Sequence, residues 1–187
     1  MSASAKPMTV DAFLDWEERQ PVRYEWDGVQ TTAMVGGSRA HSTIKVNLVV
    51  ELGLRLRDRT SRLFDSDAKL IVDGHVRYPD ASISCTPQSD EVYERQGVVE
   101  HPVIVFEVLS VGTSTQDRTD KNRGYRATPS IQRYVMLEHD RIAATVFSRS
   151  AKVWTGEPLF GPDAALELPE ADIAAIPLAG LYRNSGL

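Results

Sequence analysis

Hydrophobic residues recur at helical spacing in two segments of the N-terminal half. Between residues 41 and 57 the apolar positions fall three and four residues apart, which predicts an amphipathic helix. These positions are Ile44, Leu48, Val49, Leu52 and Leu56. A shorter helix is predicted over residues 9–17, where Val10, Phe13 and Leu14 have the same spacing.

Apolar and β-branched runs predict strands along the rest of the chain. Segments 23–26 and 29–35 flank Asp27-Gly28, a pair that favours a hairpin with a type I′ turn. Further strands are expected at 62–64 continuing through 69–72, at 76–85, 103–109, 133–137, 142–147 and 152–154, with short strands or turns over 164–181. Residues 87–97 are expected to form a polar loop.

Residues 115–127 have a helical pattern with almost no apolar face, since Tyr125 is the one large residue with an apolar body. Such a helix is either solvated or faces a polar site. Ser114 and Asp117 match a capping box at its start. Asp117, Lys121 and Tyr125 then fall at i, i+4 and i+8, on one face of a regular helix.

Composition limits the classes of function. The chain has 187 residues, 42% of them hydrophobic and 25% charged, which suits one domain over residues 1–187 with its core at about 9–181. Its net charge of −5 gives no global attraction to nucleic acid, so contact with nucleic acid needs a local basic patch. Such a patch could lie at 115–126, which carries four Lys or Arg and two Asp, although a solvated helix face explains these charges equally well.

Cysteine content and hydropathy bear on location. Cys85 is the single cysteine, so no intramolecular disulfide or cysteine-rich zinc cluster forms, and a reducing compartment, the cytoplasm, is expected. No apolar stretch approaches the length of a signal-peptide core or a membrane span, and no membrane association is expected.

Two carboxylates stand out from the strand pattern. Glu107 lies inside a continuous apolar run at 103–109, where an uncompensated charge is costly to bury. Asp80 follows Pro79 and shares a strand face with Ser82 and Ser84, while Cys85 faces the core with Ala81 and Ile83. A metal ion would compensate the acids. The alternatives are a Glu107 satisfied by a cation or amide and an Asp80 that is only a turn residue.

Three further residues have both a structural and a functional interpretation. Lys121 could pair locally with Asp117, or it could face the two carboxylates. Glu25 lies before the hairpin turn and His41 in the first turn of the long helix, where each could be an ordinary surface residue. The chain has no P-loop, His-Glu-x-x-His, Gly-x-Ser-x-Gly or Gly-x-Gly-x-x-Gly motif, which argues against P-loop nucleotide hydrolysis and zincin chemistry.

Taken together, these motifs resemble the Uma-type putative restriction endonuclease family of the PD-(D/E)xK nuclease superfamily. The residues that carry the resemblance are Tyr24-Glu25 with Asp27-Gly28, His41, Asn47-Leu48, Tyr78-Pro79-Asp80, Glu107-Val108-Leu109-Ser110, Asp117, Lys121 and Tyr125. The resemblance spans residues 9–181. It implies an α/β (α+β) fold, a restriction-endonuclease-like core with a mixed central sheet flanked by helices and an N-terminal hairpin.

The resemblance also implies a metal-dependent endonuclease that acts on nucleic acid, expected to be DNA, and works as a homodimer. Mg²⁺ or Mn²⁺ would be bound at Asp80, Glu107, Val108 and Glu25. The catalytic residues would be Asp80, Glu107, Lys121 and Glu25, with His41, Ser110, Asp117 and Tyr125 in support. The chain departs from the pattern at Leu109, where the superfamily has a lysine that Lys121 would replace, and at Val111-Gly112, where the family has Pro-Ser.

Two other functions remain open from the sequence. The missing lysine and the acidic net charge suit a non-catalytic binding or regulatory module that retains the nuclease fold. An acid hydrolase that uses Asp80 and Glu107 as an acid and base pair is a third possibility, although it leaves Lys121 without a role.

Overall fold

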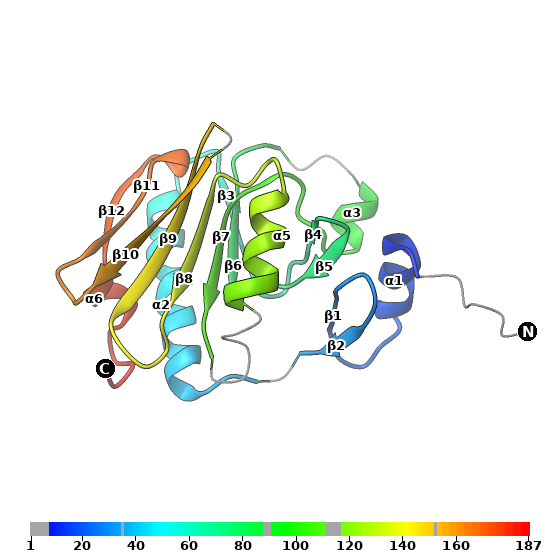
Figure 1. Cartoon of the computed structure of the whole chain (residues 1–187), viewed down its shortest axis with the longest axis horizontal. Helices are drawn as coiled ribbons and strands as arrows, with labels where there is room; N and C mark the ends of the chain where they lie inside the picture. The colour runs from blue at the N-terminus through cyan, green and yellow to red at the C-terminus, as the bar shows by residue number, and fades with distance from the viewer. Residues whose placement is uncertain (1–7, 35, 88–90, 111–116, 152) are drawn as a thin grey trace, which may run out of the picture.

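A six-stranded mixed sheet organises the computed structural model, which describes residues 8–34, 36–87, 91–110, 117–151 and 153–187 (Figure 1). Its strands lie in the order β10-β9-β8-β7-β6-β3. Their bounds are β3 Arg62–Asp65, β6 Ala81–Ser84, β7 Pro102–Val108, β8 Arg133–Leu137, β9 Ala143–Ser150 and β10 Val153–Phe160. Strands β7 and β8 are parallel, and the other neighbours are antiparallel.

Helices cover both faces of this sheet, as Figure 1 shows. Helix α2 (Arg39–Leu56) packs on one face through Ile44, Leu48, Leu52 and Leu56, the predicted stripe. The C-terminal elements β11 (Ala165–Leu168), η2 (Pro169–Ala171), β12 (Ile173–Pro177) and α6 (Leu178–Leu181) share that core. Helix α5 (Asn122–Ala127) covers the opposite face, where Tyr125 is completely buried.

A second, four-stranded sheet adjoins the first and has the order β2-β1-β5-β4. Its strands are β1 Tyr24–Trp26, β2 Thr31–Ala33, β4 Leu70–Val72 and β5 His75–Arg77. Helix α1 (Val10–Glu17) packs here, and its Phe13 ring stacks on Trp26 with centroids 5.7 Å apart. The predicted N-terminal helix and hairpin are therefore present.

Two strands predicted as continuous are each divided between the two sheets. The break before β4 follows from a turn at Asp65, whose carbonyl and side chain accept hydrogen bonds from the amides of Ala68 and Asp67. The break between β5 and β6 falls at Tyr78-Pro79-Asp80. Proline has no amide proton for the ladder, so pairing stops there. Asp80 consequently occupies the crossing between the sheets.

The hairpin turn also differs from the prediction. A type I′ turn needs positive φ at both central residues, but here Gly28 has φ 88° and Val29 does not have positive φ. The Asp27 carboxylate accepts the amides of Val29 and Gln30 at 2.9 and 2.6 Å, and this capping fixes the turn one residue later than predicted.

Several other segments differ in length or type. A short helix, α3 (Glu91–Arg95), lies in the predicted polar loop. Strands β9 and β10 pair over eight residues each and extend well beyond the predicted bounds. The predicted helix over 115–127 begins as a π-helical turn, η1 (Asp117–Lys121), and its proposed cap Ser114 lies outside the described residues.

Candidate active site

The sheet register places Asp80 opposite Glu107. Strand β6 pairs antiparallel with β7 through Ala81 and Phe106, so the preceding Asp80 comes opposite the following Glu107. Alternation along β6 is as predicted, since Ala81 and Ile83 enter the α2 core while Ser82 and Ser84 point to the other face. Cys85 packs partly against the same core.

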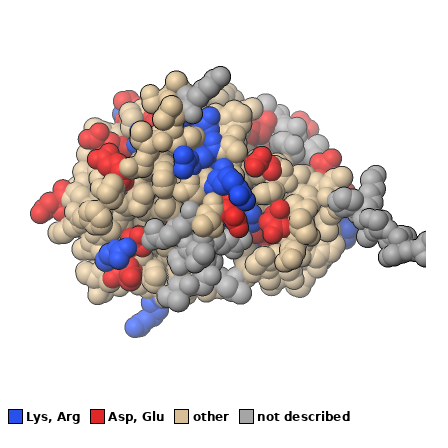
Figure 2. Space-filling model, in the orientation of Figure 1, with Lys and Arg blue, Asp and Glu red and all other residues tan. Residues whose placement is uncertain are grey.

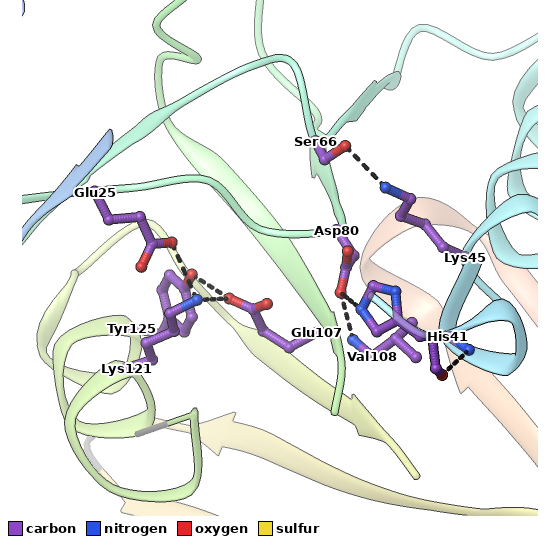
Figure 3. Close-up of polar contacts among 10 residues, drawn as sticks. Glu25, His41, Lys45, Ser66, Asp80, Glu107, Val108, Lys121 and Tyr125 are labelled. Atoms are coloured by element: carbon purple, nitrogen blue, oxygen red, sulfur yellow. Dashed lines mark hydrogen bonds and ion pairs between the residues drawn. The ribbon is translucent and has the colours of Figure 1, made fainter. Parts of the chain in front are cut away.

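Asp80 is held by one main-chain group and one side chain. Its Oδ2 accepts a hydrogen bond of 2.7 Å from the Val108 amide, and Nε2 of His41 lies 3.4 Å from the same oxygen. Figure 3 shows the His41 ring reaching Asp80 from the first turn of α2. His41 therefore lies in the site, as predicted for a supporting residue. Val108 contributes its amide, which donates a hydrogen bond to the Asp80 carboxylate.

Gly37 makes the position of His41 possible. The side-chain oxygen of Ser38 caps α2 by accepting the His41 amide at 3.2 Å, which brings the chain back over the imidazole. A Cβ on Gly37 would lie 2.6 Å from Nδ1 of His41. Only glycine leaves room for this close approach.

Lys121 joins two buried carboxylates. Its Nζ lies 3.0 Å from Oε1 of Glu25 and 3.3 Å from Oε1 of Glu107, and the ammonium group is nearly excluded from solvent. Figure 3 shows Lys121 between the two glutamates. Lys121 therefore contacts Glu107, one of the two carboxylates that it was expected to face, and the second acid that it contacts is Glu25. The alternative pairing with Asp117 involves a side chain outside the described part of the structure.

Tyr125 completes the surroundings of Glu107. Its hydroxyl donates to Oε1 of Glu107 at 2.8 Å, and its ring packs on Tyr134 with centroids 4.9 Å apart. Burial, followed by the negative charges of Glu107 and Glu25, raises the pKa of Tyr125 well above its ordinary value. The phenol is therefore a proton donor throughout the physiological pH range.

Glu25 belongs to the small sheet and is fixed by three groups. Besides Lys121, its carboxylate accepts the amide of Tyr78 at 3.1 Å and lies 3.5 Å from the buried guanidinium of Arg77. The contacts with Tyr78 and Arg77 could not be predicted from the sequence, because they depend on how β5 pairs with β1. Glu25 is thus a buried site residue rather than an exposed strand acid.

The remaining supporting residues predicted from the sequence are Ser110 and Asp117. Ser110 is half-buried directly after Leu109 at the end of β7. The backbone of Asp117 begins η1, but its side chain is outside the described part of the structure. A π-helix has i→i+5 hydrogen bonds, so the predicted common face of Asp117 and Lys121 does not follow. Single π turns are frequent at functional sites.

A buried cluster that sequence reasoning missed lies next to Glu25. Lys69 pairs with Glu17 at 2.6 Å, and the Tyr78 hydroxyl donates to Glu17 at 2.9 Å. Burial, with the hydrogen bond to Glu17, raises the pKa of Tyr78 well above its ordinary value. The sequence could have indicated a buried Glu17, because its spacing from Phe13 and Leu14 places all three on the same face of α1.

The donor chemistry of the site fits a hard divalent cation. Asp80 and Glu107 offer oxygens from adjacent strands, and such cations prefer carboxylate oxygens. Glu25 and Glu107 contact the permanent cations Arg77 and Lys121, whereas Asp80 contacts the Val108 amide and His41. Within the described residues, no three His, Cys, Asp or Glu side chains are already gathered closely enough to enclose an ion.

The fold and the site define an α+β protein with a restriction-endonuclease-like core. A solved structure titled "putative nuclease belonging to DUF820" from Anabaena variabilis superposes with a TM-score of 0.73, covering 94% of this chain and 98% of that one at 19% identity. This likeness confirms the predicted fold class.

Sequence comparison gives the family. The model of the Uma2 family, described as "Putative restriction endonuclease", matches residues 10–174, and the chain belongs to this family. Two uncharacterized proteins of Synechocystis sp. are related to it. With slr1290 the chain is 30% identical over 80% of its length and 78% of the relative, and with sll1609 it is 25% identical over 88% and 94%. No helix in the described part of the chain has the length and hydropathy to cross a membrane.

Proposed function

We propose that this protein is a Mg²⁺-dependent or Mn²⁺-dependent endonuclease that hydrolyses phosphodiester bonds, with DNA as its substrate. The single observation that carries the proposal is the buried ammonium of Lys121 beside Glu107, one strand from Asp80. Family membership supports the same reaction class. We also propose that residues 1–187 form one domain and that the chain acts as a homodimer, the common working state of this superfamily.

Asp80 and Glu107 are the residues that would hold the metal, with Glu25 adding a third carboxylate nearby. A bound divalent cation supplies an activated water and stabilises charge on the phosphoryl oxygens. The Val108 amide and His41 keep Asp80 in place, since each contacts the same oxygen. Tyr125 orients Glu107 by donating to Oε1.

Lys121 provides positive charge on the substrate side. In this proposal the ammonium would orient the attacking water and stabilise the negative charge that builds on the phosphate. Its two carboxylate partners fix its position before substrate binds, which avoids a reorganisation cost during the reaction. The lysine supplied by η1 thereby takes the place of the one missing at Leu109.

Cleavage of a plasmid and of single-stranded and duplex oligonucleotides with Mg²⁺ or Mn²⁺ tests the proposal. We expect products with 5′-phosphate and 3′-hydroxyl ends, and a loss of at least about 100-fold for Asp80→Asn, Glu107→Gln and Lys121→Met. The exposed carboxylates Asp163 and Glu157 provide matched controls, because Asp163→Asn and Glu157→Gln leave the site intact. Absence of cleavage of any DNA or RNA, or cleavage that survives Asp80→Ala, would overturn the proposal.

A non-catalytic binding module is the second candidate. It is favoured by the ion pairs of Lys121 and Arg77, which already balance Glu25 and Glu107 through side chains of the chain itself. Calorimetric titration with Mn²⁺ separates the two functions. Binding that Glu107→Gln abolishes supports the nuclease, whereas a site that binds no divalent ion supports the module.

A further inference from the structure

A groove lies beside the candidate active site, between α5 and the start of β10. It has a volume of about 410 Å³ and is lined by Thr119, Asn122, Arg123, Arg126, Ala127 and Trp154. Figure 2 shows Lys and Arg side chains gathered in the middle of this face, over α5 and the neighbouring strand. In a protein with a net charge of −5, this is a local concentration of positive charge.

Arg126 is a fixed cation in this groove. Its guanidinium carbon lies 5.4 Å from the centroid of the Phe147 ring and 5.7 Å from that of Trp154, so two aromatic side chains hold it. Among the described residues it has no carboxylate partner. Arg123 differs, because it pairs with Asp120 at 3.3 Å where both side chains are exposed. The charge of Arg126 is therefore both positioned and available to an anion.

The aromatic wall behind Arg126 is itself rigid. Trp154 donates its indole hydrogen to the Arg126 carbonyl at 3.1 Å. Arg149 stacks on Trp154 at 4.8 Å and donates to the carbonyls of Arg126 and Thr128, both at 2.8 Å. These bonds satisfy carbonyl groups at the end of α5. Arg149 thus supports the groove, and Arg126 presents the charge.

Asn122 provides a hydrogen-bonding group without a partner. The residue is 7% exposed, lines the groove, and its side-chain amide makes no hydrogen bond to any described residue. Its Oδ1 is buried without a donor. A buried amide left unsatisfied costs free energy, so its retention calls for an explanation. Because Asn122 lines the groove, an occupant of the groove is the partner that we infer for this amide.

Helical geometry connects the groove to the site. Lys121 and Tyr125 face Glu107, and each is followed in the chain by a groove residue, Asn122 and Arg126 respectively. Lys121 ends η1 and precedes α5 as its N-cap, and successive residues of α5 point about a quarter of a turn apart, so this helical segment contributes to two adjacent sites. A strand whose phosphodiester reaches Lys121 would continue across Asn122 and Arg126.

We propose that this groove binds the nucleotide next to the cleaved phosphodiester of the substrate strand. Arg126, with Arg123 at the rim, would bind the backbone phosphate, and the Asn122 amide would accept a hydrogen bond from the base or sugar. This inference rests on the proposed nuclease function, since it takes the strand cleaved at Lys121 as the ligand. It adds the residues by which that strand is held.

Fluorescence anisotropy of labelled DNA and RNA oligonucleotides tests the groove. The full chain is titrated in EDTA, so that binding is measured without cleavage, from low salt upward. We expect Arg126→Gln to weaken binding at least about 10-fold and to lower the slope of log affinity against log salt by about one. The exposed Arg183, at the far end of the chain, provides the matched control, and Arg183→Gln should retain both the affinity and the slope.

Asn122→Ala separates a ligand role from a structural one. Removal of an unsatisfied amide should leave the thermal unfolding midpoint unchanged or higher, while oligonucleotide affinity falls several-fold. A lower midpoint with unchanged affinity would overturn the assignment of Asn122. Equal affinities for Arg126→Gln and Arg183→Gln would overturn the groove as a whole.

The outcomes also distinguish this inference from the proposed function. If the chain binds oligonucleotide through Arg126 but does not cleave it, the groove inference is supported and the nuclease function is overturned. If the chain cleaves with Mg²⁺ but Arg126→Gln leaves the affinity and the salt slope unchanged, the nuclease function is supported and the groove inference is overturned. Failure of the wild-type chain to bind any DNA or RNA at about 50 mM salt would also overturn the groove.

Discussion

Nε2 of His41 lies 3.4 Å from Oδ2 of Asp80, and this contact ties the first turn of α2 to the start of β6. The two residues are 39 positions apart in the sequence. The Val108 amide donates a hydrogen bond to the same oxygen. The geometry of the proposed metal ligand is therefore set by three separate segments of the chain.

Replacement of His41 tests whether this contact positions Asp80. Groups that orient a metal ligand typically contribute 10- to 100-fold to affinity. We expect His41→Asn to weaken Mn²⁺ binding by about 10-fold in calorimetric titration, while unfolding in urea changes little. His101→Asn is the matched control, because His101 is exposed and its φ of 48° suits asparagine. Equal affinities for the two variants would mean that His41 does not position Asp80.

Gly37→Ala should produce a similar effect without removing any hydrogen-bonding side chain. The added methyl group would lie 2.6 Å from Nδ1 of His41, so the imidazole must move from Asp80. A reduction of about 5- to 10-fold in Mn²⁺ affinity is expected on the same physical grounds. Gly36→Ala is the matched control, since a Cβ there meets nothing within 4 Å. If the two alanine variants bind Mn²⁺ equally, the close approach is irrelevant to the site.

Lys121 is expected to be the strongest single contributor to stability among the site residues. Lys121→Met leaves Glu25 and Glu107 without their shared cation, which should lower the free energy of unfolding by about 3–5 kcal/mol. Glu25→Gln in the Lys121→Met background should recover part of this loss, and urea denaturation of the four members of the cycle measures the coupling.

Arg123→Met supplies the comparison for this cycle. Its pair with Asp120 is exposed, so its loss should change the free energy of unfolding by less than about 1 kcal/mol. A Lys121→Met variant as stable as Arg123→Met would show that the buried ion pairs do not hold the fold together.

Alkaline pH should destabilise the protein through its buried tyrosines. Burial, with the nearby charge of Glu138, raises the pKa of Tyr182 above its ordinary value, and Tyr78 shifts in the same direction. A group whose pKa is raised by folding stabilises below its unfolded pKa, about 10 for tyrosine, and this contribution is lost as pH rises toward the folded pKa. Urea unfolding from pH 8 upward should show Tyr182→Phe losing less stability above about pH 10 than the wild type does. Parallel pH profiles for the two would contradict this linkage.

Local patterns in the sequence predicted most strands of the central sheet and most of the helices that cover it. The stripe on α2 and the apolar run of β7 are both as expected, because each depends on a periodicity that neighbouring residues set. The family motifs also led to Asp80, Glu107, Lys121 and Glu25, which the structure brings into one region. The chemical roles of these residues stay predictions.

What the sequence did not predict depends on contacts between distant segments. The split between β5 and β6 follows from Pro79, but which sheet each half joins is a matter of tertiary packing. The partners of Glu25, namely Arg77 and the Tyr78 amide, arise from that packing as well. The π turn of η1 replaces an α-helical turn with the same composition, and no residue pattern marks it.

The ammonium of Lys121 also fastens the two sheets to each other, because Glu25 lies on β1 of the small sheet and Glu107 on β7 of the large one. Within the small sheet, β1 is joined to β5 through the pair Trp26 and Val76 and through the contacts of Glu25 with Arg77 and the Tyr78 amide. A divalent cation bound at Glu107 would repel the ammonium and compete with it for this carboxylate, which would weaken the link between the two sheets. We therefore expect faster amide exchange in the hairpin of β1 and β2 when a divalent cation occupies the site.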